Sequence, residues 1–565
     1  MSENYITGSE AMMRSLINEG VDMIFGYPGG QIMPVFDALY DYKKQLTHVL
    51  VRHEQGAIHA AQGYARVSGK TGVAIVTSGP GATNAVTGIA DAMIDSTPIV
   101  LIAGQVGSLM LGTDAFQETD VVGITQPITK WSYQIRSTDD IGWIVAQAFY
   151  IASTGRPGPV VLDFTRDAQV NKVDFKPHKV TRIRSYAPVP ELEPDAIADA
   201  ARIINGAKKP LALVGQGVII GNAEKELLVF LHKADIPAGS TILGLSALPS
   251  DEPLNVGMLG MHGNIAPNLK TNECDVLIAI GMRFDDRVTG NLNTYARQAK
   301  IIHFDIDPAE IDKNVKTTVA VLGDAKETLP AVTRLLKENR HTEWRESFKP
   351  LFEKEMDKVI RTELYPAEGP IKMGEVVNKV TEATGNDAIM VTDVGQNQMM
   401  GVRYSKFKYT RSMITSGGLG TMGFGLPAAI GAKFGAPDRT VCLVVGDGGL
   451  QMTIQELGTM MQSGVEVKII LLNNSFLGMV RQWQELFWQE RYSETPMQNP
   501  DFIKIAEAYH IHGKKVTERK DLDGAIDEML KTRGAYLLEV VVEQKGMVYP
   551  MTPAGTCVTN IILGE

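Results

Sequence analysis

The stretch Val441-Cys442-Leu443-Val444-Val445-Gly446-Asp447-Gly448 decides the fold of this chain. Its apolar, β-branched residues predict a buried strand, and the glycine turn after them predicts a change of direction into a helix. A second apolar run, Val467 to Leu472, follows that helix-like segment and ends at Asn473-Asn474. Two buried strands joined by a helix predict a parallel sheet.

The ends of these two strands predict a metal site. Because the second strand lies beside the first, Asn474 reaches the same sheet edge as Asp447. One carboxylate, one amide oxygen and a backbone carbonyl, completed by phosphate oxygens and water, form an octahedral site that suits magnesium. A glycine turn at a helix N-terminus also binds phosphate, so we expect a diphosphate ligand.

The Gly446-Asp447-Gly448 turn alone could be structural or could bind an ordinary nucleotide. Its pairing with Asn473-Asn474 resembles the signature of enzymes that use thiamine diphosphate.

Composition limits the possible classes of protein. A chain of 565 residues predicts about three domains. The net charge of −10, with no basic block, disfavours a nucleic-acid or anionic-membrane partner.

The first residues lack a signal-peptide pattern, and no apolar run approaches the roughly 18 residues of a membrane span, so we expect a soluble, cytoplasmic protein. The three cysteines, Cys274, Cys442 and Cys557, lie far apart and predict neither disulfides nor zinc, and Cys442 is expected in a strand core.

The pattern of strand, glycine turn and helix appears a second time near the N-terminus. The apolar run Gly72–Thr77 ends in Ser78-Gly79-Pro80-Gly81, a helix is expected over 82–94, and a second strand over Ile99–Ala103. The two ends of the chain are therefore expected to be related α/β domains.

A third α/β unit is expected between them, with strands at 211–214, 276–280 and 301–304. Charged stretches that contain proline, Lys172 to Pro194 and Lys337 to Pro370, are the expected linkers. The fold class is therefore α/β, with three doubly wound parallel-sheet domains whose ligands lie at the carboxyl ends of the strands.

Glu54 is the candidate acid of the cofactor chemistry. Thiamine diphosphate becomes reactive when its C2 proton is removed, and a protein acid that protonates the pyrimidine ring makes this possible. Glu54 follows the apolar run Val49-Leu50-Val51, where a strand is expected to end. The alternative is that Glu54 only caps the helix that follows.

Motifs along essentially the whole chain resemble the catalytic subunits of acetolactate synthase, also called acetohydroxyacid synthase. They are Tyr27-Pro28-Gly29-Gly30, Arg52-His53-Glu54-Gln55, residues 77–84, 112–118 and 155–160, Leu259-Gly260-Met261-His262-Gly263, Arg283-Phe284-Asp285-Asp286-Arg287, residues 416–420, and Tyr549-Pro550-Met551. The resemblance implies a pyrimidine-binding domain at 1–175, a central FAD-binding domain at 190–340, a diphosphate-binding domain at 368–545 and a tail at 546–565.

The resemblance also assigns residues to thiamine diphosphate and magnesium. It implies that Glu54 protonates the pyrimidine ring and that Met422, which could otherwise be core packing, forces the cofactor into a bent shape. The other implied contacts are Pro80, Asn84, Gln117, Val394, Gly395, Gln396, Asn397, Gly420, Gly448, Gly449, Gly478 and Met479, with Phe116 among the catalytic side chains. Magnesium would bind Asp447, Asn474 and the carbonyl of Phe476. Since Glu54 and Asp447 belong to different domains, the family's arrangement implies an active site between two protomers and an inactive monomer.

An FAD site is implied in the central domain. Gly215-Gln216-Gly217 alone is a poor dinucleotide fingerprint and is more often a simple turn. The wider set implied by the resemblance is Arg156, Gly215, Gly217, Thr241, Met261, His262, Gly281, Arg283, Asp305 and Asp324. In this family the flavin is structural, since the net reaction passes no electrons to an acceptor.

Arg287 and Trp483 are the residues expected to select the acceptor substrate. A guanidinium matches the carboxylate of a keto acid, and an indole offers an apolar wall for the extra methylene of 2-oxobutyrate. The alternatives are a surface ion pair of Arg287 with Asp285 or Asp286, and ordinary packing for Trp483.

The reaction implied is decarboxylation of pyruvate and ligation of the hydroxyethyl carbanion to pyruvate, giving 2-acetolactate, or to 2-oxobutyrate, giving 2-aceto-2-hydroxybutyrate. This step begins branched-chain amino-acid biosynthesis. The alternative is pyruvate oxidase or another decarboxylase or carboligase on the same scaffold; a flavin-only redox protein and an inactive binding scaffold fit the motifs less well. Implied partners are a second copy, as a homodimer or dimer of dimers, and a small regulatory subunit.

Three single residues and one tripeptide depart from the family's pattern. Gln31 stands in place of a small residue, Asn397 in place of histidine and Gly449 in place of serine, and Phe164-Thr165-Arg166 replaces Val-Pro-Lys. None is Glu54, Asp447 or Asn474, so the chemistry is expected to be retained.

Overall fold

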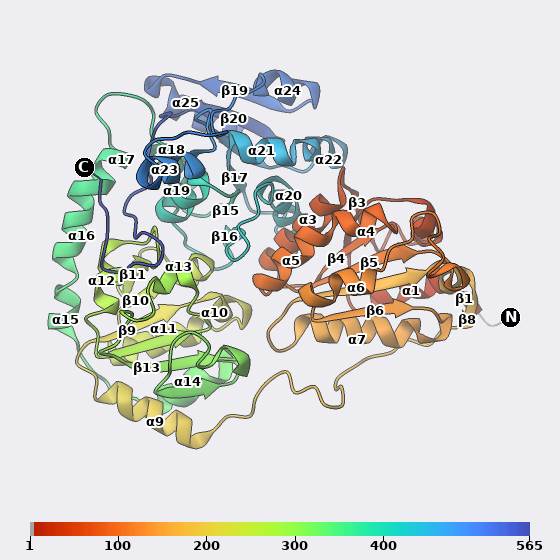
Figure 1. Cartoon of the computed structure of the whole chain (residues 1–565), viewed down its shortest axis with the longest axis horizontal. Coiled ribbons are helices and arrows are strands. Elements are labelled where there is room, and N and C mark those ends of the chain that lie inside the picture. The colour runs from red at the N-terminus through yellow and green to blue at the C-terminus, as the bar shows by residue number, and fades with distance from the viewer. Residues whose placement is uncertain (1–4, 565) are drawn as a thin grey trace.

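The computed structural model describes residues 5–564 and contains three six-stranded sheets (Figure 1). The N-terminal sheet, in red and orange, has the order β3-β2-β4-β5-β7-β6, and every neighbouring pair is parallel. Its strands are β2 (Met23–Gly26), β3 (Thr47–Leu50), β4 (Gly72–Val76), β5 (Ile99–Gln105), β6 (Trp131–Ile135) and β7 (Pro159–Thr165).

The C-terminal sheet, in cyan and blue, repeats this arrangement. Its order is β16-β15-β17-β18-β20-β19, the same as in the N-terminal sheet when each is numbered from its own first strand, and all its pairs are parallel. Its strands are β15 (Ile389–Thr392), β16 (Met413–Ile414), β17 (Val441–Gly446), β18 (Lys468–Asn473), β19 (His512–Val516) and β20 (Tyr536–Val541). The predicted relation between the two ends of the chain is confirmed.

The central sheet has the order β11-β10-β9-β12-β13-β14, which is the strand order of dinucleotide-binding Rossmann domains. Its strands are β9 (Pro210–Val214), β10 (Ala238–Ser240), β11 (Asn255–Met258), β12 (Val276–Ile280), β13 (Lys300–Asp305) and β14 (Val319–Leu322). The chain changes direction across the sheet between β9 and β12, and in such folds the ligand crevice opens at the carboxyl ends of that pair.

Helices cover both faces of each sheet. Around the N-terminal sheet they are α1 (Gly8–Asn18), α2 (Met33–Asp41), α3 (Glu54–Ser68), α4 (Pro80–Asn84), α5 (Val86–Ile94), α6 (Val121–Thr125), α7 (Ile141–Ser153) and α8 (Arg166–Val170). Around the central sheet they are α9 (Pro194–Asn205), α10 (Gln216–Ile220), α11 (Glu224–Ala234), α12 (Ile265–Thr271), α13 (Asp286–Thr289) and α14 (Ala325–Leu335). Around the C-terminal sheet they are α18 (Met373–Ala383), α19 (Gln396–Tyr404), α20 (Gly425–Gly435), α21 (Asp447–Met452), α22 (Leu457–Ser463), α23 (Gly478–Phe487), α24 (Phe502–Ala508) and α25 (Leu522–Lys531).

Alternate residues of one strand enter separate hydrophobic cores, as a doubly wound sheet requires. In β4, Val73 and Ile75 pack in one core, whereas Ala74 and Val76 pack in another on the opposite face. The C-terminal and central sheets also divide their buried residues between two cores. The predicted fold class is confirmed.

The stretches expected as linkers contain regular structure. Residues Lys172–Asp174 form β8, which pairs antiparallel with β1 (Tyr5–Thr7). The expected linker over 337–370 is helical: it holds α15 (Thr342–Glu346), α16 (Lys349–Glu355), a π-helical turn over Met356–Ile360 and α17 (Arg361–Leu364), along the left edge of Figure 1. Trp344 and Phe348 are buried in a core of the central domain, and this packing holds the segment in place.

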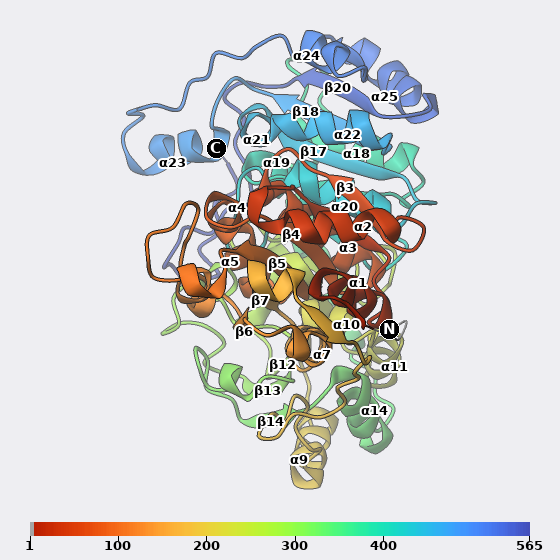
Figure 2. The same ribbon diagram turned by 90° about the vertical axis from the view of Figure 1, so that its right-hand side faces the viewer.

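The N- and C-terminal domains pack against each other through α3 and α20, which Figure 2 shows between the two sheets. The backbones approach closely at two glycines. A Cβ atom at Gly63 would lie 2.0 Å from the carbonyl oxygen of Ala428, and one at Gly431 would lie 1.8 Å from that of Ala60. Only glycine allows this contact.

A buried ion pair of the N-terminal domain lies at the same interface and positions a donor across it. Arg66 Nη2 lies 2.8 Å from Asp95 Oδ2, and Arg66 Nη1 donates to the carbonyl oxygen of Thr415 at 2.5 Å. The hydrogen bond from Arg66 to Thr415 therefore joins the two domains in addition to the packing of α3 on α20.

No helix within residues 5–564 combines the length and apolar character that a bilayer span requires.

Gly63→Ala is expected to destabilise the protein. The added methyl group cannot fit against Ala428, and forcing extra volume into a packed interface costs about 1–3 kcal/mol. Gly524→Ala is the matched control, because a Cβ there meets nothing within 4 Å and alanine favours a helix interior. Calorimetric unfolding should show a lower melting temperature for Gly63→Ala alone; equal melting temperatures would contradict the close approach.

Candidate active site

Asp447 and Asn474 lie at one edge of the C-terminal sheet, as predicted from the order of strand and turn. β17 and β18 are neighbours in parallel register, with Gly446 opposite Leu472. Both side chains line a cavity at the carboxyl ends of these strands. Ten further predicted residues line the same cavity: Val394, Gly395, Gln396, Asn397, Met422, Gly448, Gly449, Phe476, Gly478 and Met479.

The Asp447 carboxyl group fits a cation. It is 1% exposed, and burial raises its pKa, an effect opposed by the amide of Asn499. No Lys, Arg or His in the described part of the chain forms an ion pair with it. Among residues 5–564 no three His, Cys, Asp or Glu side chains gather as a metal site, so a metal here would take one carboxylate, an amide and other oxygens.

The same cavity fits a diphosphate. α19 begins at Gln396 and α21 at Asp447, and the first N–H groups of a helix have no acceptor within it. The lining requires glycine at two positions: Gly395 has φ +131°, which favours glycine, and a Cβ at Gly478 would lie 2.2 Å from Gln396 Oε1. Gly420 does not line the cavity, although a Cβ there would lie 3.9 Å from Val394.

Asp393 shapes this site but was not among the predicted residues. Its fully buried carboxylate accepts the backbone N–H groups of Val394, which lines the cavity, and of Gly423 and Gly425, which follow the lining residue Met422. Burial raises its pKa, and these N–H groups lower it. A sequence signal existed, because Asp393 directly follows β15 as Asp447 follows β17.

Gly449 and Asn397, two of the residues that depart from the family's pattern, lie in this cavity. A Cβ at Gly449 would lie 2.4 Å from Asp393 Oδ1, so a serine would not fit this conformation. Asn397 Nδ2 donates to the carbonyl oxygen of Val444 at 3.3 Å, so one of its two donor hydrogens already has a partner.

Glu54 is the first residue of α3 and lies in a second cluster, in the N-terminal domain. The helix cap is His53, whose side chain accepts the N–H of Gln55, so Glu54 is not the capping residue. Its Oε2 accepts from Asn84 Nδ2 at 3.0 Å, while Oε1 lies beside Gly81. The helix expected over 82–94 is interrupted at Ala85, which leaves Pro80 and Asn84 on the short α4 beside Glu54.

The loop over 106–120 brings Gln117 to this cluster, with Phe116 next to it in the chain. Gln117 has φ +62°, and a Cβ at Gly79 would lie 2.8 Å from its carbonyl oxygen. Glu118 accepts backbone N–H groups from Gly112 and Ala115, which fixes the tip of the loop. Phe116 is 82% exposed there.

One chain does not bring the two clusters together. None of Glu54, Pro80, Asn84, Phe116 and Gln117 lines the Asp447 cavity in the described residues, which is lined only by residues between 373 and 480. Apolar side chains are exposed near both clusters, including Leu109 and Met110 on one side and Leu419 and Val480 on the other.

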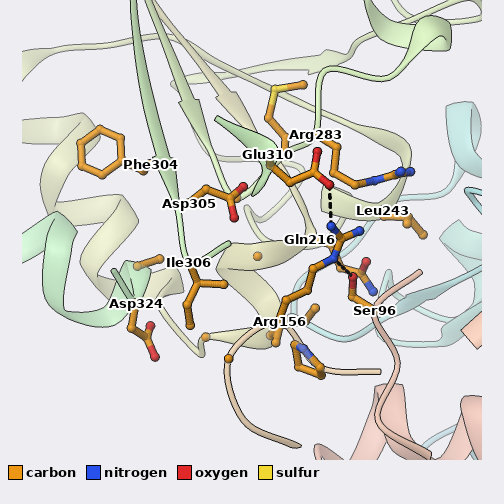
Figure 3. A pocket seen from close by; sticks show the side chains of 18 of the residues that line it. Ser96, Arg156, Gln216, Leu243, Arg283, Phe304, Asp305, Ile306, Glu310 and Asp324 are labelled. Atoms are coloured by element: carbon orange, nitrogen blue, oxygen red, sulfur yellow. Dashed lines mark hydrogen bonds and ion pairs between the residues drawn. The ribbon is translucent and has the colours of Figure 1, made fainter. Parts of the chain in front are cut away.

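A cavity of about 490 Å³, within the usual range for bound ligands, lies at the carboxyl ends of β9 and β12 in the central domain. It is lined by seven predicted residues: Arg156, Gly217, Thr241, Gly281, Arg283, Asp305 and Asp324. Figure 3 shows that Arg156 enters from the N-terminal domain and meets Glu310 and Ser96. Ser96, Gln216 and Glu310 also line the cavity and were not predicted.

Three predicted FAD residues lie outside this lining. Gly215 packs under it, since a Cβ there would lie 2.1 Å from the carbonyl oxygen of Gly281. Met261 and His262 belong to a neighbouring loop, where the N–H of Met261 donates to the carbonyl oxygen of Arg287 and burial lowers the pKa of His262 to about 4. The structure thus joins seven of the ten residues in one cavity.

Arg287 and Trp483 meet, although they come from different domains. The Arg287 guanidinium lies 5.9 Å from the centre of the Trp483 ring. The Arg287 guanidinium also lies 3.5 Å from the Asp286 carboxylate, and both side chains are exposed. This is the surface ion pair that was the alternative role for Arg287.

The other two departures from the family's pattern contact each other's segments. Arg166 donates to the carbonyl oxygen of Gly30, and the carbonyl oxygen of Gln31 accepts from the side chain of Gln169.

Comparisons with known proteins give consistent matches along nearly the whole chain. Three family models match it, described as the N-terminal TPP binding domain, the central domain and the C-terminal TPP binding domain of thiamine pyrophosphate enzymes, over residues 6–124, 197–332 and 393–540. The acetolactate synthase isozyme 2 large subunit of Escherichia coli K12 is 44% identical over 97% of this chain and 98% of its own length. The acetolactate synthase large subunit of Lactococcus lactis is 44% identical over 98% and 95%, and the probable acetolactate synthase large subunit of Methanocaldococcus jannaschii is 43% identical over 98% and 95%.

Proposed function

This chain belongs to the acetolactate synthase large subunits of the thiamine pyrophosphate enzyme family, and on that basis we propose which residues bind the cofactors, the metal and the substrates. It is a thiamine-diphosphate-dependent acetolactate synthase, a transferase that decarboxylates pyruvate and joins the remaining two-carbon unit to a second 2-keto acid, in branched-chain amino-acid biosynthesis. The observation that carries the division of roles is the shared edge of β17 and β18, where Asp447 and Asn474 line one cavity. The bounds 1–175, 190–340, 368–545 and 546–565 remain our proposed domains.

Magnesium would bind Asp447, Asn474 and the carbonyl of Phe476. A buried carboxylate without a cationic partner in residues 5–564, beside an amide, is the donor set that a hard cation takes. The cavity glycines and the N-termini of α19 and α21 would bind the diphosphate.

Glu54 would protonate the pyrimidine ring of the cofactor. Thiamine diphosphate, when bound, would supply an acidic C2–H group and a ring that accepts electrons during decarboxylation of a keto acid. Glu54 would hold a proton for the pyrimidine ring at Oε1, because Oε2 already accepts from Asn84. Gln117 and Phe116 would flank the reacting carbon.

A second copy of the chain would complete the site. The Glu54 cluster and the Asp447 cavity lie apart in one chain, and apolar side chains are exposed near both. If the cluster of one copy meets the cavity of the other, both surfaces are covered and the monomer is inactive. We therefore propose a homodimer or a dimer of dimers, with a small regulatory subunit as a further partner, and a cytoplasmic location.

The central cavity would bind FAD as a structural cofactor. Its place at the strand switch of a Rossmann-type sheet supports a dinucleotide, and Arg283 would pair with phosphate. Met261 and His262 could contact FAD only from the neighbouring loop. Arg287 would bind the keto-acid carboxylate, and Trp483 beside it would favour 2-oxobutyrate by about 1–3 kcal/mol.

The function is tested by offering pyruvate and 2-oxobutyrate together while each cofactor is omitted in turn. We expect both acetohydroxy acids to form only with thiamine diphosphate and Mg²⁺ present. Acetate or acetaldehyde without acetolactate would indicate an oxidase or a simple decarboxylase instead, and turnover without thiamine diphosphate would indicate flavin chemistry.

Glu54→Gln is expected to keep the fold and cofactor binding while kcat falls by about 10²- to 10⁴-fold, because the amide cannot give up a proton to the pyrimidine ring. Steady-state assays at saturating cofactor measure the change. Glu368→Gln, at an exposed position, is the control and should be neutral. Near-normal turnover of Glu54→Gln would refute its role as the acid.

Asp447→Ala is expected to remove the dependence of thiamine diphosphate affinity on Mg²⁺, because the only carboxylate of the proposed site is lost. Calorimetric titration with thiamine diphosphate, with and without Mg²⁺, measures it. Asp523→Ala, with an exposed side chain in the same domain, should behave as wild type. Unchanged cofactor saturation would rule out Asp447 as a ligand.

A further inference from the structure

A short strap, residues 495–499, crosses the loop that carries two of the proposed metal ligands. The N–H of Leu477 donates to the carbonyl oxygen of Thr495 at 2.9 Å, and the N–H of Met497 donates to that of Ser475 at 2.9 Å. Phe476 and Pro496 form an antiparallel bridge between these bonds. The backbone around Asn474 and Phe476 is therefore held from outside the sheet.

The strap ends at Asn499, whose side chain joins the ends of β17 and β18. Asn499 Nδ2 donates to Asp447 Oδ2 at 2.5 Å and to Asn473 Oδ1 at 3.0 Å. Its own Oδ1 accepts from Gln451 Nε2 at 3.0 Å. All polar atoms of this amide are thus used to hold the surroundings of one carboxylate.

Asn473 ties this arrangement to the sheet. Its Oδ1 also accepts from the N–H of Ser475 at 3.1 Å, and its Nδ2 donates to Glu539 at 2.8 Å. Glu539 is buried and pairs with Lys515 at 2.9 Å. The anchor of Asn499 is therefore a network across β18, β20 and β19, which are paired neighbours in the sheet.

The other end of the strap reaches α23, the helix of Trp483. Thr495, which is 1% exposed, donates through Oγ1 to Gln484 Oε1 at 2.9 Å. Gln484 Nε2 donates to the carbonyl oxygen of Ser493 at 2.9 Å. The strap thus links the proposed metal site to the helix that carries the proposed acceptor residue.

We propose that Asn499 is a positioning residue of the metal site, acting through Asp447 and Asn473; this inference rests on the proposed function. In the described part of the chain, Asn499 is the only side chain that donates to the Asp447 carboxylate. Partners that orient a metal ligand set its affinity for the metal, and removing one typically costs about 10- to 100-fold. Asn499 needs no contact with the cofactor or substrate to have this effect.

Asn499→Ala tests the inference on the full-length protein. Binding of Mg²⁺ is measured by calorimetry at fixed thiamine diphosphate, and binding of Mn²⁺ as a probe by electron paramagnetic resonance. We expect the affinity for either ion to fall about 10- to 100-fold, with kcat restored by excess Mg²⁺. The control is Gln498→Ala, an exposed amide in the same strap, which should bind both ions as wild type does.

The melting temperature without cofactor separates positioning from stability. We expect it to change little in Asn499→Ala, while the stabilisation by thiamine diphosphate with Mg²⁺ is reduced. Asn499→Leu, of similar volume, replaces the alanine variant if that variant does not fold.

Unchanged ion affinity in Asn499→Ala, an equal loss in Gln498→Ala, or a loss of kcat that excess Mg²⁺ does not restore would each overturn the inference. Wild-type protein that binds thiamine diphosphate equally well without Mg²⁺ would overturn the proposed function itself, and the inference with it.

Discussion

The parallel pairing of β17 with β18 is the constraint on which the site depends. In a parallel pair both carboxyl ends lie at one edge, so Asp447 and Asn474 meet although 26 residues of helix and strand separate them in the sequence. An antiparallel pair would place them at opposite edges. The helix that starts at Asp447 and the helix that starts at Gln396 also begin at this edge, which adds N–H donors beside a buried carboxylate. The strap over 495–499 then fixes the loop after β18 from the solvent side.

The N-terminal domain supports the cavity of its own chain without supplying the acid to it. Asp91 accepts the hydroxyl groups of Ser416 and Thr421, and Asp95 accepts the N–H groups of Gly417 and Gly418. Both carboxylates are fully buried on or beside α5. The turn that leads to Met422 is therefore held by the same domain whose Glu54 we assign to the site of another copy. Each chain would thus contribute to two sites, one through its packing and one through its acid.

Buried parallel strands could be predicted closely because they are continuous apolar runs that end at glycine or a polar residue. The run 276–280 coincides with β12, and 441–445 falls within β17. The helical segment over 342–364 was not predicted, because it is rich in charged residues and its few buried side chains, such as Trp344, are covered by residues of the central domain that its own local pattern does not show. The need for glycine at position 449 could not be predicted either, because it depends on how close Asp393 lies in the folded chain.

By itself the sequence determined the three α/β units, the likeness of the two outer ones and the chemistry available at their strand ends, since periodicity and turn residues are local properties. Tertiary structure decided which of those ends meet. It placed Arg287 against Trp483, Arg156 in the central cavity and Asn499 on Asp447, and it kept Glu54 apart from Asp447 within one chain. These contacts join residues that lie far apart along the chain, and their geometry follows from how sheets and helices pack, which no local pattern encodes.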